Sequence, residues 1–269
     1  MKKIIELLYR FYDKQIDTDF IYEFIDIVTE YKDLEPYINN VDFSKTSNDD
    51  GYVASYCTNT GVITIYFDEV MKIINDGNNY QSFLSLKEKS LDGVLSVVQV
   101  ILHEIEHARQ KKLRGTDSSL EAQILRLSSI EISFDDVFDL IRSGYDDDIL
   151  MKEIIEKKEL YKKFYKYCPS ERLAQINSYE EIISYLDMMP FDTSKLTMIN
   201  DFLKTHSLLS GYDKKCPTFY FIKQFGKDTE YKLLDIENSD ISSYEKMKLG
   251  LYVPKDEINK HIKKLTLFD

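Results

Sequence analysis

The chain has no tryptophan, only five prolines and only nine glycines among its 269 residues. A many-stranded β-sandwich needs frequent tight turns that these residues normally supply, so their scarcity argues against an all-β fold. The three cysteines, Cys57, Cys168 and Cys216, are too few and too widely spaced for a disulfide framework or a CxxC motif. We therefore expect reduced thiols in a mainly helical protein.

Positive charge and long hydrophobic runs are also in short supply. The chain has 35 basic and 47 acidic residues, and its net charge of −12 disfavours binding to a nucleic-acid backbone. The longest apolar stretch, 94–102, is too short to span a bilayer and is interrupted by Ser96 and Gln99. Glu6 and Arg10 interrupt the apolar segment that a signal peptide would require. The sequence predicts a cytoplasmic protein without a nucleic-acid or membrane partner.

The chain has enough apolar residues for a large core, because 43% of it is hydrophobic and it contains 15 phenylalanines and 20 tyrosines. Hydrophobic periodicity predicts helices at 18–33, 68–75, 90–113, 118–130, 134–143, 147–167, 169–188 and 193–208. A β-branched and aromatic segment at 52–67, broken by Asn59-Thr60-Gly61, predicts a hairpin. We expect a mainly helical α+β fold, with lobes at 1–145 and 146–269 or one continuous domain.

The long helix at 90–113 contains the segment His103-Glu104-Ile105-Glu106-His107, which matches the pattern HExxH. Residues four apart project from the same side of a helix, so His103 and His107 can bind one metal ion. Glu104 follows the first histidine and is placed to take a proton from a water that the metal activates. The pattern predicts metal-assisted hydrolysis, with Glu104 as the general base.

Over this motif the chain resembles the zincin metallopeptidases. The longer form of their motif, HExxHxxGxxH, is absent, because Gln110 stands where that form has glycine. The resemblance is therefore to the gluzincin type, in which a glutamate on a later helix is the third zinc ligand, often within an ExxA or ExxS pattern. It implies a small sheet before the HExxH helix, a zinc ion and hydrolysis of a peptide or protein substrate.

Two glutamates are candidates for the third ligand. Glu171 lies near the predicted start of a helix and is followed by the small residue Ala174, whereas Glu121 is followed at the same spacing by the bulky Ile124. We favour Glu171. Gln175, on the same helix, is a candidate to hydrogen-bond a ligand imidazole, and Gln110, one turn after His107, is a second such candidate.

Two residues depart from the zinc peptidase pattern: Glu106 stands at a position that is usually uncharged, and Arg109 at one that is usually apolar. On a helical wheel Glu106 falls away from the face of the two histidines, so a solvated or salt-bridged carboxylate there is compatible with a metal. The predicted function is a zinc metallopeptidase. The alternatives are a non-catalytic zincin-like module with a structural metal, similar to the ImmA/IrrE regulators, and a helical protein without metal.

Overall fold

The computed structural model describes residues 2–11, 17–44, 53–75, 89–117, 119–127 and 168–188, together with 242, 245, 248 and 249. The chain divides into two compact units. Of the described elements, helix α5 (Leu120–Leu127) belongs to the second unit. Helix α8 (Pro169–Asp187) begins in the second unit and continues without a break into the first, from Ala174 onward. The predicted helices at 134–143, 147–167 and 193–208, and the predicted lobe boundary after residue 145, lie outside the described residues.

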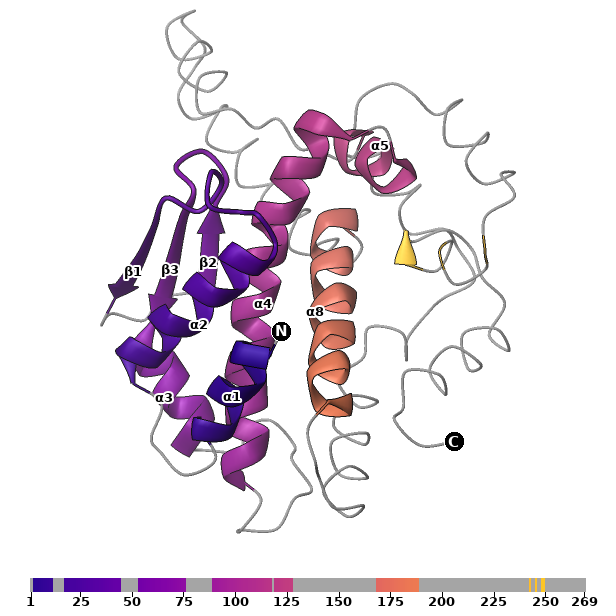
Figure 1. Ribbon diagram of the computed structural model, residues 1–269. Coiled ribbons are helices and arrows are strands. Elements are labelled where there is room, and N and C mark those ends of the chain that lie inside the picture. The colour runs from indigo at the N-terminus through magenta and orange to yellow at the C-terminus, as the bar shows by residue number, and fades with distance from the viewer. Residues whose placement is uncertain are drawn as a thin grey trace, which may run out of the picture. The chain divides into compact units, whose positions relative to one another are not determined.

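A three-stranded sheet forms part of the first unit (Figure 1). Strands β2 (Ala54–Cys57) and β3 (Val62–Tyr66) are antiparallel, which confirms the predicted hairpin. Strand β1 (Asn40–Ser44), which no pattern in the sequence predicted, pairs in parallel with β3, so the order is β1-β3-β2. The described residues are therefore mainly helical with a small sheet, which confirms the α+β class.

The hairpin turn depends on Gly61, which has a φ of +70°. A Cβ atom at this position would lie 2.7 Å from the carbonyl oxygen of Tyr37 and 2.9 Å from the amide nitrogen of the Asn39 side chain. The backbone N–H of Asn39 donates to the carbonyl of Gly61 at 2.7 Å, and its side chain donates to the carbonyl of Thr60. Glycine is required here by both the left-handed backbone and the close approach of the preceding segment.

Helix α2 (Thr18–Tyr31) begins at a capping residue and packs beside β1. The Asp17 carboxylate accepts a hydrogen bond from the backbone N–H of Phe20 at 2.9 Å, which caps the first turn of the helix. The hydroxyl of Tyr22 donates to the carbonyl of Val41 at 2.8 Å, and its ring lies 4.8 Å from that of Phe43. Aromatic packing and one hydrogen bond therefore join α2 to the edge strand.

Helix α4 (Lys89–Thr116) contacts β2, α2 and α3 (Phe67–Asn75). Its fully buried apolar side chains belong to the main hydrophobic core; they are Val97, Val98, Ile101, Leu102, Ile105 and Ala108. The same core includes side chains from β3, from α8 and from the N-terminal helix α1 (Lys2–Phe11). In the part of the chain that the structure describes, no helix combines the length and the apolar character needed to cross a membrane.

Within the first unit, α8 lies beside α4 (Figure 1). The buried amide of Gln99 donates to the hydroxyl of Ser178 at 3.0 Å. Farther along α8, Glu181 accepts a hydrogen bond from Tyr185 and forms an ion pair with Lys32 at 2.5 Å. Helix α8 is thus attached by polar contacts both to α4 and to the C-terminal end of α2.

A candidate metal centre

Helix α4 brings the two histidines of the HExxH motif together. The rings of His103 and His107 lie with their centroids 4.8 Å apart and their planes at 87°, and both side chains are half-buried. This arrangement follows from the four-residue spacing on one helix face. The neighbouring apolar side chains Leu102 and Ile105 are fully buried, so the half-buried imidazoles lie at the edge of the core.

Glu171 lies in the first turn of α8. The helix begins at Pro169, whose fixed φ and missing N–H suit a first helical position. The carbonyl of Cys168 accepts the backbone N–H of Arg172 at 2.9 Å, and the buried guanidinium of Arg172 donates to the carbonyl of Lys248 at 3.2 Å. A carboxylate in this turn is also favoured by the helix dipole. These contacts define where the third predicted ligand stands.

The three predicted ligands form one group. One donor atom from each of His103, His107 and Glu171 lies within 4.8 Å of the other two. Tetrahedral ligand atoms about 2.0–2.1 Å from zinc are separated by roughly 3.4 Å. The three donor atoms therefore need to move only slightly closer together to bind one ion. Two imidazoles and one carboxylate are a donor set that zinc accepts. Glu121, the alternative ligand, is not a member of this group.

A hydrogen bond supports one of the imidazoles. The Nδ1 atom of His107 lies 3.2 Å from the side-chain oxygen of Gln110, which is 1% exposed. If Nδ1–H donates to this oxygen, Nε2 becomes the nitrogen with the lone pair that a metal needs. This contact is compatible with the role predicted for Gln110, which stays a prediction. The hydroxyl of Ser178 donates to the backbone carbonyl of Gln175 at 2.9 Å. The role predicted for the Gln175 side chain stays a prediction.

The predicted general base, Glu104, is nearly buried beside the two ligands, with 8% of its surface exposed. It follows His103 directly in the sequence, so its side chain projects from α4 in a direction rotated about 100° around the helix axis from that of His103. A carboxylate held in such a poorly solvated position interacts strongly with nearby charges and dipoles. Its position in the sequence next to His103 is compatible with the predicted proton transfer, which stays a prediction.

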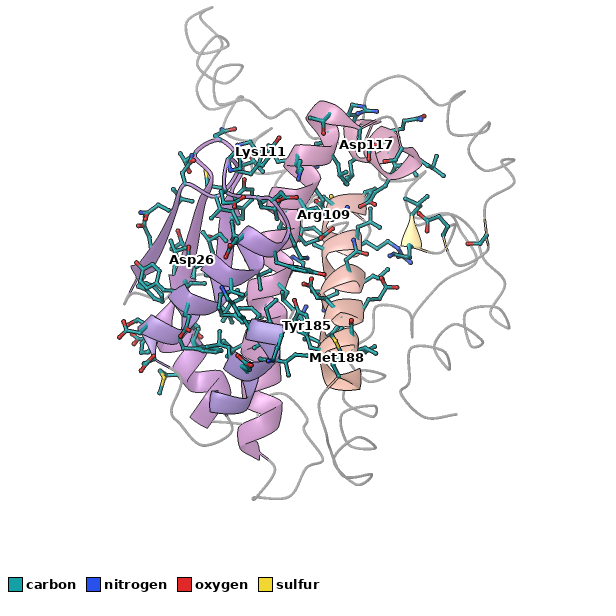
Figure 2. The ribbon with its side chains drawn as sticks, in the orientation of Figure 1. Asp26, Arg109, Lys111, Asp117, Tyr185 and Met188 are labelled. Atoms are coloured by element: carbon teal, nitrogen blue, oxygen red, sulfur yellow. The ribbon has the colours of Figure 1, made fainter. Side chains whose placement is uncertain are left out.

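Glu106 is buried and salt-bridged. It is 2% exposed, and the guanidinium of Arg109 lies 2.6 Å from it through one nitrogen and 2.7 Å through another. The side chain of Asn177, on α8, donates to the same carboxylate at 2.7 Å. Figure 2 shows Arg109 on the part of α4 that lies beside α8. Of the two states compatible with a metal, the salt-bridged one is therefore present, and the solvated one is not.

Asn177, Gln99 and Ser178 were missed as residues near the site, although the sequence carries a signal for them. Gln99, Glu106 and Gln110 follow the spacing of a single stripe along a helix, beside the face that carries His103 and His107. Polar side chains rarely form such a stripe on an otherwise buried helix unless polar partners face them. The stripe thus predicts a polar neighbouring element, but it does not say which one.

Cysteine and tyrosine side chains of the hairpin have altered acidity. Hydrogen bonds from Thr60 hold the pKa of the exposed Cys57 thiol below its usual value, and the positive charge of Lys111 on α4 acts in the same direction. Burial raises the pKa of Tyr56 to about 12, and its hydroxyl donates to the carbonyl of Tyr37. Figure 2 shows Lys111 on α4 near the hairpin. None of these side chains belongs to the His-His-Glu group.

Comparison with known proteins found no match for this chain among family models, curated proteins or solved structures.

Proposed function

We propose that this protein is a zinc-dependent peptidase of the gluzincin type. The observation that carries the proposal is the meeting of His103, His107 and Glu171, which lie on two helices far apart in the sequence. The donor set and the adjacent Glu104 match the requirements for metal-assisted hydrolysis. The resemblance of the HExxH segment to zincins favours a peptide bond as the bond that is cleaved.

In the proposed mechanism His103, His107 and Glu171 hold the zinc ion. When bound, zinc supplies positive charge that lowers the pKa of a water molecule and stabilises negative charge on a carbonyl oxygen. Glu104 accepts a proton from the water whose oxygen attacks the carbonyl carbon of the peptide bond. It then donates that proton to the departing nitrogen as the carbon–nitrogen bond breaks. Gln110 keeps the imidazole of His107 in the required tautomer and orientation.

Metal analysis of protein purified without a histidine tag tests the site. We expect about one zinc per chain after incubation with zinc and removal of the excess. His103→Ala and Glu171→Ala should lose it, whereas the matched control Glu121→Ala should keep it. Failure of the unchanged protein to bind zinc, or loss of zinc only in Glu121→Ala, would refute the proposed ligand set.

Cleavage of a peptide library, followed by mass spectrometry, tests the reaction. We expect zinc-dependent products, and Glu104→Gln should bind zinc normally but cleave about 10² to 10⁴ times more slowly, because the general base is lost. Equal cleavage by Glu104→Gln would contradict the mechanism. Stoichiometric zinc without any cleavage of peptides or proteins would favour the non-catalytic zincin-like module instead.

A further inference from the structure

Four polar residues join α4 to α8 next to the candidate metal centre. The amide of Gln99 donates to Ser178 at 3.0 Å, and the amide of Asn177 donates to Glu106 at 2.7 Å. We call these residues the α4–α8 clamp. Gln99, Glu106 and Ser178 are buried, with exposed fractions of 8%, 2% and 1%. Hydrogen bonds in such surroundings are costly to break, because the groups left behind cannot reach water.

The clamp holds α8 from two directions along α4. Gln99 and Glu106 are two turns apart, about 10 Å along the helix axis, yet their partners on α8 are adjacent residues. Gln99 therefore contacts the Asn177–Ser178 pair from the N-terminal direction of α4, and Glu106 contacts it from the C-terminal direction. A shift of α8 along α4 in either direction would lengthen one of the two hydrogen bonds. Apolar packing alone does not define such a position, because it is not directional.

The charge on Glu106 strengthens this contact. Arg109 neutralises the carboxylate and fixes its orientation through several short contacts on the same helix. The oxygen that accepts the Asn177 hydrogen bond is thus held in place by a residue of α4 itself. A hydrogen bond to a charged acceptor is also about twice as strong as one between neutral groups.

We propose that the clamp is the device that positions Glu171 against His103 and His107, with Asn177 as its main positioning residue. Asn177 and Glu171 lie on one unbroken helix, six residues or about 9 Å apart. Fixing Asn177 on α4 therefore fixes the first turn of α8, where the carboxylate ligand stands. This inference rests on the proposed metal site, and it explains why the HExxH segment here contains a buried Glu106 and the nearby Arg109.

A double-mutant cycle tests the proposal, with zinc affinity measured by competition with a chromophoric chelator. Asn177→Ala should weaken zinc binding about 10- to 100-fold, as loss of a residue that orients a ligand does in other metal sites. Glu171→Ala should no longer retain zinc after the excess is removed, but its two histidines should keep a weak affinity that titration with excess zinc can measure. In this background Asn177→Ala should weaken zinc binding no further, because the ligand that it positions is already gone. Ser184→Ala, at an exposed position on the same helix, is the matched control and should leave affinity unchanged.

The outcomes separate the proposal from its alternatives. Equal weakening by Asn177→Ala in both backgrounds would overturn it, because Asn177 would then support α4 and its histidines rather than Glu171. Unchanged affinity of Asn177→Ala would overturn it as well. Ser178→Ala provides a second, milder variant if Asn177→Ala does not fold, and it should show the same dependence on Glu171. Absence of zinc binding in the unchanged protein would refute the metal site, and the clamp's role with it.

Discussion

At the scale of single residues, the HExxH segment shows how the same helix can carry both reactive and structural charge. Glu104 and Glu106 are both nearly buried, but their surroundings differ. Glu106 is held by Arg109 and Asn177, so its charge is compensated within the protein. Glu104 lies between the two histidines in the sequence, where the proposed metal ion would add a nearby positive charge. Burial of a carboxylate therefore indicates a partner, and the partner distinguishes the two roles.

Removal of Arg109 should be strongly destabilising. Arg109→Met leaves the carboxylate of Glu106 buried without its countercharge, so the free energy of unfolding should fall by about 3 kcal/mol. The double variant Glu106→Gln/Arg109→Met removes both charges and keeps an acceptor for Asn177, so it should recover most of the loss. Urea denaturation at neutral pH measures both. A double variant no more stable than Arg109→Met would contradict this explanation.

The described cysteines should differ in reactivity. The lowered pKa of the exposed Cys57 increases its thiolate fraction near neutral pH, whereas burial raises the pKa of Cys168. In a Cys216→Ser background, used because Cys216 lies outside the described residues, iodoacetamide should modify Cys57 first. Thr60→Val removes a hydrogen bond to the thiol, so the pH at which alkylation reaches half its maximal rate should rise. An unchanged pH profile would rule out Thr60 as the cause.

At the scale of secondary-structure elements, the hairpin and the HExxH helix were predictable because their signals are local. The β-branched segments flanking Gly61 and the apolar periodicity of α4 both lie within short windows. Strand β1 was not predicted, because Asn40, Asp42 and Ser44 make it look like a polar loop. It becomes a strand only by pairing in parallel with β3, a contact that its own sequence does not reveal.

Two glycines should respond in opposite directions to the same substitution. Gly61→Ala places a Cβ atom on a backbone with a φ of +70° and close to Tyr37, so stability should fall by about 1–3 kcal/mol. Gly115→Ala lies in α4 with no atom within 4 Å of the added carbon, so stability should rise by about 0.5–1 kcal/mol. Urea midpoints of the two variants provide the comparison. Destabilisation by Gly115→Ala would contradict it.

At the scale of the whole molecule, a metal that joins two distant helices also links binding to folding. Any ligand that binds only the folded protein raises the free energy of unfolding. Because His107 and Glu171 come from different helices, the unfolded chain does not hold them together. The proposed zinc ion should therefore stabilise the folded protein as well as serve as the cofactor of the reaction.

Zinc should stabilise the unchanged protein but not a ligand variant. At a free zinc concentration about 100 times the Kd, the free energy of unfolding should rise by about 2.7 kcal/mol. The gain should largely disappear in His103→Ala and persist in Glu121→Ala. Urea denaturation with and without zinc measures the difference. An equal gain in His103→Ala would show that the metal stabilises the protein at some other site.

The sequence by itself determined the elements and the chemistry that short-range patterns carry. The spacing of His103 and His107, the start of α8 at Pro169 and the hairpin turn at Gly61 all depend on local geometry, which composition and periodicity specify. Tertiary structure decided what depends on the approach of distant segments. It grouped Glu171 rather than Glu121 with the histidines, paired β1 with β3, and placed Asn177 against the buried Glu106. The physical reason is that such contacts depend on how whole helices and strands pack, which no local pattern specifies.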